Sequence, residues 1–273
     1  MTPINFNHIQ IPVLAMGNGW LVVDKPAGLT VHNAAAKDLR SLLIARILKE
    51  TAIQEQTAMD PDFGVHPVHR LDKETSGVML LAVHRESFRF FSSQFESRQV
   101  KKQYIAILHG RLEKPDGSDL WGTWEWPLSE SAGGRQNPEG PGNRKECRTR
   151  YRVLEHSTHY TMAAVEILTG RTHQIRRHAK LSGHPVVGDA RYGSMRAINF
   201  LTRHFGFDRL ALHARSLTLQ LPGGNAPETI ETPEIPMQML NLFYHDLGNV
   251  GSDHDNLLKY NGGENDDCND TPN

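Results

Sequence analysis

The uninterrupted apolar segment 77–83, with the sequence GVMLLAV, constrains the fold of this chain more than any other feature. A strand with one face in water alternates apolar and polar residues, whereas an unbroken apolar run indicates a strand covered on both faces. We therefore expect this segment to be an interior strand of a sheet. The residues just before it, 66–76, carry two histidines and a dense group of charges, which need either a structural or a chemical explanation.

Further strands are predicted at 19–26, 101–110, 148–156, 160–168 and 210–222, where apolar residues run together or alternate with polar ones. Helices are predicted at 38–50, 86–99 and 172–183, the last with Thr172 as its N-cap and Gly183 just past its end. Several strands follow one another with no helix between them. This pattern favours an α+β fold with a mixed, mostly antiparallel central β-sheet flanked by helices and loops.

The chain of 273 residues is long enough to bury a core, and we expect one domain over residues 1–245. Residues 113–146 mix Gly, Pro and Ser with three tryptophans and form an irregular insertion that is too long for a simple connection. Residues 246–273 are polar and rich in Gly, Asn and Asp. We expect this acidic tail to be disordered.

The net charge of −1 conceals an uneven distribution. Seven acidic residues but only one basic residue, Lys259, lie from Asp246 onward, which leaves 29 basic and 24 acidic residues in the body. The body therefore carries a charge of +5. A mildly basic body suits a polyanionic partner.

The sequence contains no sign of a membrane segment or of secretion. No apolar run approaches the roughly 20 residues that a membrane helix needs, and the N-terminal residues lack the basic-then-apolar pattern of a signal peptide. Cys147 and Cys268 lie far apart, so we expect free thiols in a reducing compartment and a cytoplasmic protein.

The motifs of metal and phosphate sites are missing from the sequence. Histidines are numerous, but there is no H-E-x-x-H motif, no cysteine pair and no run of carboxylates, so we expect no metal site. The glycine pairs lack the lysine and the context of a P-loop, and no G-x-S-x-G supports a serine hydrolase. We expect no cofactor.

Asp72 permits two interpretations. From the local pattern alone, it is more often a turn acid that binds the amides of the residues after it. Clustered cations, however, lie on the predicted helix at 172–183 and on the residue just before it, and like charges so close together need a buried acid or a polyanion as a partner. Asp72 is a candidate for that acid, and RNA or DNA phosphates for the polyanion. The clustered cations are Arg171, Arg176, Arg177 and Lys180.

Several motifs, in the correct order over residues 13–222, resemble those of RluA-type pseudouridine synthases. HRLDKETSG at 69–77 resembles the H-R-L-D-x-x-T-S-G signature, and GRTHQIRRH at 170–178 resembles the G-R-T-H-Q-I-R motif. KKQYIAILHG, WLVVDKPAGLTVH, GHPVVGDARYG and LALHARSL are similar to further segments of the family. The resemblance implies the pseudouridine synthase fold and isomerisation of specific uridines in ribosomal or transfer RNA. It also implies base flipping and an essential aspartate, without a cofactor.

Matching positions assign roles to individual residues. Asp72 corresponds to the catalytic aspartate, and Tyr104 to the tyrosine that stacks on the target base and takes part in proton transfer. Arg176 corresponds to the basic residue that pairs with the aspartate, and Arg70 to the arginine that enters the RNA helix when the base leaves it. Leu212 matches an apolar residue of the uridine pocket.

Other residues of these motifs are further candidates for contact with the RNA. His69, Thr75 and Gln174 are candidates for the uridine pocket, with a structural role as the alternative for His69. The expected phosphate contacts are Lys101, Lys102, Arg171, Arg177 and Lys180. The tryptophans at 121, 124 and 126 either pack on the body or stack with RNA bases.

Two other functions compete with the synthase. One is a non-catalytic RNA-binding protein or RNA chaperone on the same fold, and the other is a metal-dependent hydrolase that uses the histidines. The simultaneous presence of Asp72, Tyr104 and Arg176 favours the enzyme. We expect a monomer that recognises RNA through its catalytic domain, because the resemblance starts close to Met1, with no N-terminal RNA-binding module before it.

Overall fold

The computed structural model describes residues 10–32, 37–115 and 120–248. In this part of the chain, the strands form a 10-stranded sheet in the order β1-β2-β4-β11-β5-β10-β9-β6, with β12 beside β11 and β3 beside β4. The strands are β1 (Val13–Gly17), β2 (Trp20–Lys25), β3 (His66–Pro67), β4 (Ser76–Ala82), β5 (Lys101–His109), β6 (Gly122–Trp124), β9 (Thr149–His156), β10 (Tyr160–Ile167), β11 (Leu212–Gln220) and β12 (Pro227–Glu231). A small separate sheet contains β7 (Leu128–Ser129) and β8 (Arg144–Lys145).

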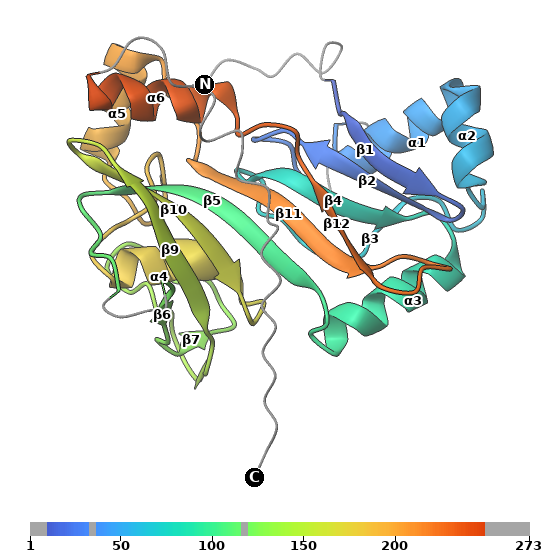
Figure 1. The fold of residues 1–273 in the computed structure, drawn as a ribbon, viewed down its shortest axis with the longest axis horizontal. Coiled ribbons are helices and arrows are strands. Elements are labelled where there is room, and N and C mark those ends of the chain that lie inside the picture. The colour runs from blue at the N-terminus through green and yellow to red at the C-terminus, as the bar shows by residue number, and fades with distance from the viewer. Residues whose placement is uncertain (1–9, 33–36, 116–119, 249–273) are drawn as a thin grey trace.

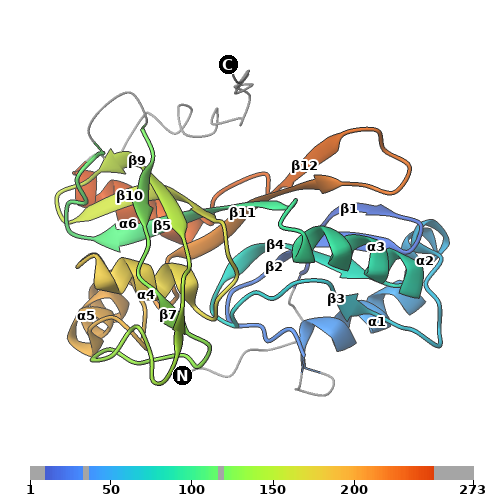
Figure 2. The ribbon, with the colours of Figure 1, turned by 90° about the horizontal axis from the view of Figure 1, so that it is seen from below.

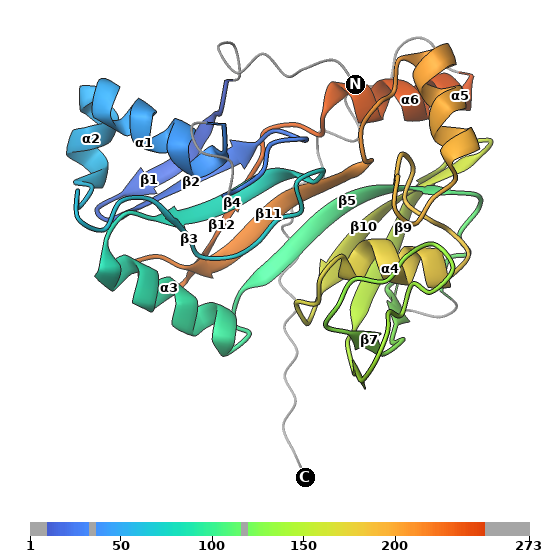
Figure 3. The ribbon, with the colours of Figure 1, turned by 180° about the vertical axis from the view of Figure 1, so that it is seen from behind.

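The helices of the described residues flank the sheet (Figure 1). They are α1 (Leu39–Lys49), α2 (Thr51–Thr57), α3 (Arg85–Glu96), α4 (Gln174–Leu181), α5 (Met195–Phe205) and α6 (Met237–Leu247). α1 lies over one half of the sheet and α4 over the other, on the same side, as Figures 2 and 3 show. Residues of both halves and of α4 line the candidate site.

The pairing between β4 and β11 joins the two halves of the sheet. It is parallel, whereas the other strand pairs of the sheet are antiparallel. The pairing opposes His213 to Ser76 and Ala214 to Gly77. β11 thus lies between β4 and β5 although it follows both in the sequence.

Alternate residues of the central strands enter two different cores. In β4, Met79 and Leu81 belong to the larger core, which includes residues of α1, whereas Val78 and Leu80 belong to a smaller core with Phe91 of α3. Every residue of β4 is buried. The expectation that the apolar segment 77–83 forms a strand covered on both faces is therefore confirmed.

The expected fold class is confirmed, and each strand and helix predicted from the sequence is present within a few residues of its expected bounds. The N-cap of α4 was predicted wrongly. The cap is His173, not Thr172, and it has left-handed backbone angles of φ 54° and ψ 27°. Gly183 follows the helix end with φ 85°, as expected for the residue past a helix.

The expected boundary at residue 246 is also corrected. α6 continues to Leu247, and Asp246 accepts hydrogen bonds from Ser157 Oγ at 2.6 Å and from the His159 amide at 2.7 Å. The disorder expected for the tail and the free thiol of Cys268 concern residues outside the described ranges. Within those ranges, no helix combines the length and the apolar character needed to cross a membrane.

Part of the expected insertion 113–146 belongs to the main sheet, because β6 forms its edge beside β9. Trp124 is buried and stacks on Tyr151, with ring centroids 4.7 Å apart. Trp126 is exposed, and Trp121 lies against the guanidinium of Arg150 at 4.9 Å. Trp124 and Trp126 both meet the ring of His178, with centroids 6.5 and 6.1 Å away, and Trp121 packs against the larger core, so all three tryptophans contact the body.

Candidate active site

Asp72 lies in the loop between β3 and β4. Hydrogen bonds within the loop and from Lys25 hold this loop in place. The Thr75 amide donates to the Asp72 carbonyl oxygen at 3.1 Å, which closes a turn. The wholly buried Lys25 donates from Nζ to the carbonyl oxygens of Lys73 at 3.1 Å, Leu29 at 2.8 Å and Pro26 at 2.9 Å. The backbone that carries Asp72 is therefore tied to the end of β2.

A row of residues across the sheet brings this loop next to Tyr104. Ala214 of β11 pairs with Gly77 on one side and with Tyr104 of β5 on the other. Gly77 has φ 115°, and a Cβ at this position would lie 2.1 Å from the Ala214 carbonyl oxygen. Only glycine permits both this backbone conformation and this close approach. The strands can therefore approach closely where the site forms.

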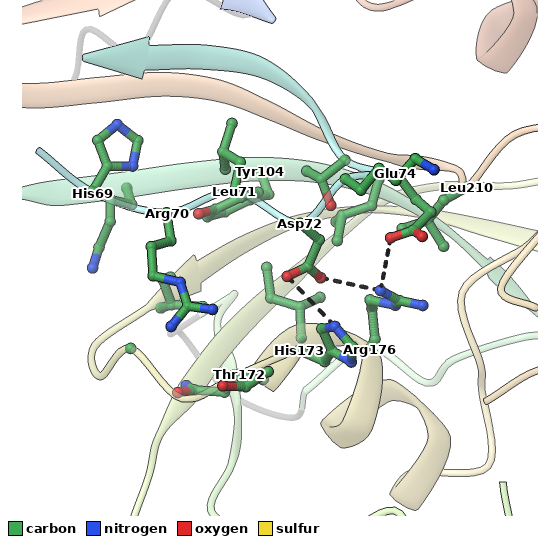
Figure 4. A pocket seen from close by; sticks show the side chains of 18 of the residues that line it. His69, Arg70, Leu71, Asp72, Glu74, Tyr104, Thr172, His173, Arg176 and Leu210 are labelled. Carbon is green, nitrogen blue, oxygen red and sulfur yellow. Dashed lines mark hydrogen bonds and ion pairs between the residues drawn. The ribbon is translucent and has the colours of Figure 1, made fainter. Parts of the chain in front are cut away.

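Arg176 of α4 reaches the Asp72 carboxylate from the other half of the molecule. Its Nη1 donates to Asp72 Oδ2 at 3.1 Å and lies 3.5 Å from Glu74 Oε2 (Figure 4). Its Nε and Nη2 donate to Asp189 at 2.7 and 2.9 Å. Arg176 therefore forms its bidentate pair with Asp189 and makes a single contact with Asp72.

Burial and charge together set the protonation of this cluster. Burial opposes the charge of Arg176, but Asp189 and then Asp72 outweigh it and raise the pKa of Arg176 above its ordinary value. Burial also disfavours the charge of Asp189, yet the bonds from Arg176 hold the pKa of that carboxyl below its usual range. Burial, with a smaller effect of Asp72, raises the pKa of Tyr104, so its phenol keeps its proton. The cluster therefore contains the ionised pair of Arg176 and Asp189 and the neutral phenol of Tyr104.

The site opens into a cleft with a volume of about 2080 Å³. Basic side chains outnumber acidic ones in its lining, which suits a polyanion. The basic residues are Arg70, Lys73, Arg98, Lys101, Lys102, Arg150, Arg171, Arg176, Arg191 and Arg209. The acidic residues are Asp72, Glu74, Glu96, Glu166 and Asp208.

The structure brings most of the expected residues together. The three residues expected to be catalytic all line the cleft, and Asp72 and Arg70 extend from their loop toward the same side (Figure 4). The side-chain oxygens of Asp72 contact Arg176 and His173, whereas its main-chain oxygen forms the turn. The expected binding residues that also line the cleft are Arg70, His69, Thr75, Leu212, Arg171, Gln174, Lys101 and Lys102.

Arg177 is wholly buried, so its expected phosphate contact is corrected. Its guanidinium donates to the carbonyl oxygens of Ser129, Pro138 and Glu139. These carbonyls belong to the expected insertion, so Arg177 fastens that segment to α4. Lys180 is absent from the cleft lining, and its phosphate contact stays a prediction.

Two motif residues have structural partners. His69 stacks on Phe95 with ring centroids 5.0 Å apart and accepts a hydrogen bond from the Leu80 amide at 3.0 Å. Burial lowers the pKa of His69 to about 3, so it stays neutral. Gln174 donates from Nε2 to Arg148 O and Thr149 Oγ1, both at 2.9 Å. These contacts favour the structural role for His69 and a positioning role for Gln174.

Sequence reasoning missed Asp189 and Lys25 as parts of the site, and also Tyr192, whose ring centroid lies 5.5 Å from the guanidinium of Arg176. Asp189 is a single acid in GHPVVGDARYG, and nothing in the pattern identifies Arg176 as its partner. Lys25 is the last residue of the apolar strand β2, where a lysine ordinarily faces solvent. Its only signal is its place in the family-like segment WLVVDKPAG. In the described part of the chain, no group of three or more His, Cys, Asp or Glu side chains could hold a metal ion.

Comparisons with known proteins identify the family of this chain. Residues 19–181 match the family described as RNA pseudouridylate synthase. The chain is 31% identical over 226 residues to tRNA pseudouridine synthase C of Haemophilus ducreyi, which covers 78% of this chain and 87% of that relative. It is 33% identical over 217 residues to ribosomal large subunit pseudouridine synthase C of Vibrio vulnificus, and there the match covers 78% of this chain but only 62% of the relative.

A solved structure has the same fold. The human protein RNA Pseudouridylate Synthase Domain Containing 1 superposes with a TM-score of 0.63 at 27% sequence identity, over 82% of this chain and 84% of that one. The family match extends over more than half of the chain and includes the loop of Asp72, the strand of Tyr104 and the helix of Arg176. The protein therefore belongs to the RNA pseudouridylate synthase family of RNA isomerases.

Proposed function

We propose that the protein isomerises specific uridines to pseudouridine in ribosomal or transfer RNA, with Asp72 as the essential catalytic group and no cofactor. The observation that carries this proposal is the contact between the Asp72 carboxylate and the buried Arg176, inside a cleft lined mainly by basic residues. The relatives named above, one for transfer RNA and one for the large ribosomal subunit, support these two RNA classes.

The reaction needs little more than one well-placed carboxylate. The bond between N1 of uracil and the sugar carbon C1′ breaks, the base rotates, and a bond forms between C5 and C1′. The hydrogen leaves C5 and a proton is gained at N1, so the product is an isomer of the substrate. Asp72 acts either as a nucleophile toward the sugar or as a base on a neighbouring proton. Both routes require the ionised form of this carboxylate.

The substrate uridine must leave the RNA stack before Asp72 can reach it. Tyr104, one of the residues lining the cleft, offers an aromatic face to the extruded base, and Leu212 adds an apolar contact. Arg70 is exposed beside Asp72. Its planar guanidinium is suited to fill the space left in the stack, which a lysine side chain would not do.

A non-catalytic RNA-binding protein on this fold is the alternative. Basic residues alone would serve that function, and a carboxylate in the cleft would repel phosphates. The cleft nevertheless contains Asp72, with a buried arginine directed at it. This arrangement favours catalysis over binding alone.

The test uses transcribed transfer and ribosomal RNA, incubated with the protein in EDTA and then mapped for pseudouridine. The decisive variant is Asp72→Asn, and the matched control is Asp208→Asn, which removes another acid from the same cleft. We expect product with wild type and with the control, none with Asp72→Asn, and RNA binding in all three. Binding without product in wild type, even on total RNA, would favour the alternative. Product that is absent in EDTA and appears when metal ions replace the EDTA would favour metal-assisted chemistry.

A further inference from the structure

His173 is a second partner of the Asp72 carboxylate. Its Nε2 lies 3.7 Å from Asp72 Oδ1, while Arg176 binds the other oxygen, Oδ2 (Figure 4). Each carboxylate oxygen thus faces one nitrogen of α4 or its cap. The distance of 3.7 Å is longer than a hydrogen bond, and contacts of this kind commonly shorten when the substrate binds.

His173 combines an uncommon backbone conformation with a ring that faces Asp72. The residue caps α4 in the left-handed region, with φ 54° and ψ 27°, which is uncommon outside glycine although histidine adopts it more often than most residues. Its side chain makes no capping hydrogen bond, so the helix end does not account for this conformation. The ring contacts Asp72 instead.

Tyr192 fixes the opposite edge of the same ring. Its hydroxyl lies 3.1 Å from His173 Nδ1, and the two rings meet edge to face with centroids 5.8 Å apart. Tyr192 is wholly buried, and the guanidinium of Arg176 lies 5.5 Å from its ring centroid. One tyrosine therefore supports both partners of Asp72.

The protonation of His173 follows from these contacts. Burial raises the pKa of Tyr192, so its phenol keeps a hydrogen to donate to Nδ1. A neutral imidazole that accepts at Nδ1 carries its proton on Nε2, which faces Asp72. Burial lowers the pKa of His173, although Asp72 partly opposes that shift. The charged groups facing the ring are Asp72, Arg176, Arg191 and Asp189.

We propose that His173 is a positioning residue of the isomerisation, which holds Asp72 Oδ1 through its neutral Nε2–H while Tyr192 holds the ring. This inference rests on the proposed function, because it assigns Asp72 the reacting carboxylate. With Arg176 on Oδ2 and His173 on Oδ1, the carboxylate cannot turn about its bond to Cβ. One orientation is then presented to the sugar of the target uridine.

The kinetic test compares His173→Gly with His173→Asn in single-turnover formation of pseudouridine on a transcribed RNA. Glycine adopts the left-handed backbone without strain, and asparagine tolerates it and supplies a side-chain N–H. We expect His173→Gly to fold and to bind RNA like wild type, but to react about 100-fold more slowly, as expected for a misplaced reacting group. Asparagine, or imidazole added to the glycine variant, should restore part of the rate. A wild-type rate in His173→Gly would overturn the proposal, as would an equal loss of RNA binding and rate.

A second measurement does not depend on activity. The titration of His173, followed by NMR of the folded protein, should shift to lower pH in Asp72→Asn, because the charge of Asp72 raises the pKa of this imidazole. In Tyr192→Phe, the hydroxyl that bonds to His173 Nδ1 is missing, so the proton of the neutral imidazole should distribute between Nδ1 and Nε2. An unchanged titration in Asp72→Asn would overturn the proposed contact even if the enzyme is active. An inactive wild type with the expected shift would count against the proposed function alone.

Discussion

Asp189 accepts two hydrogen bonds from Arg176, at 2.7 Å from Nε and 2.9 Å from Nη2, and so fixes the guanidinium whose remaining nitrogen contacts Asp72. The Asp189 carboxylate is itself held by the amides of Arg191 at 2.9 Å and Tyr192 at 3.0 Å. The orientation of Arg176, the partner of Asp72, thus depends on the carboxylate of Asp189, which is fully buried.

The first prediction concerns Asp189→Asn. Because this change leaves Arg176 buried without its bidentate partner, we expect the free energy of unfolding to fall by about 3–5 kcal/mol and the turnover rate to fall with it. Glu74→Gln is the control, since half-exposed Glu74 is 3.5 Å from the same guanidinium and should contribute less than about 1 kcal/mol. Denaturant unfolding and single-turnover rates measure both effects. Equal losses in the two variants would contradict the role of Asp189.

A pH dependence is expected from Lys25. Burial lowers the pKa of its ammonium from the ordinary 10.5 to about 7, with Glu74 and Asp72 opposing part of the shift. Between these two values the unfolded chain binds a proton that the folded protein lacks, so stability rises with pH. The free energy of unfolding of wild type should therefore rise with pH, relative to that of Lys25→Met, from about pH 7 upward. Below pH 7 the two free energies should change with pH in parallel. If the two free energies stay parallel above pH 7 as well, the Lys25 ammonium keeps its charge while it donates to the three carbonyl oxygens.

The junction of β4 and β11 is tested by Gly77→Ala. The new Cβ would lie 2.1 Å from the Ala214 carbonyl oxygen at a φ of 115°, so either the parallel pairing breaks or the loop of Asp72 moves. We expect a loss of several kcal/mol in unfolding free energy, or no folded protein. Gly142→Ala, at φ 75° with open space around it, should cost about 1 kcal/mol through its backbone alone. Similar costs for the two substitutions would refute the steric argument.

RNA binding should depend on Arg98, an exposed residue that lines the cleft. Arg98→Gln should weaken binding of every RNA similarly and reduce the slope of log affinity against log salt by about 0.7, as for one lost phosphate contact. Arg203→Gln is the control, because Arg203 is exposed on α5 and does not line the cleft. Filter binding over a salt series gives both slopes. If the slope for Arg98→Gln stays at the wild-type value, the RNA does not pass Arg98.

The elements that could be predicted from the sequence are those with a local pattern. The run 77–83 indicates a strand covered on both faces because alternate side chains meet two cores. α1 was predicted from apolar residues at helical spacing, and it begins after Asp38, whose side chain accepts from the Ser41 amide at 2.8 Å. α5 lacked such a signal, since it buries Leu201 and exposes Phe200 and Phe205.

Relationships over long distances in the sequence could not be predicted in this way. No pattern in 210–222 states that this strand inserts between β4 and β5, because strand order depends on contacts across more than a hundred residues. The different surroundings of Arg176 and Arg177 could not be predicted from the sequence either. Arg177 resembles its neighbour Arg176 in sequence, yet Arg176 faces the cleft and Arg177 holds interior carbonyls.

The order of β4, β11 and β5 has a consequence during translation. Asp72, Tyr104 and Arg176 have all been synthesised before β11 emerges from the ribosome, but Ala214, which lies between Gly77 and Tyr104, has not. A nascent chain that ends before residue 212 therefore contains the three side chains without the strand that sets them side by side. We therefore expect the chain to modify RNA only after β11 has been synthesised.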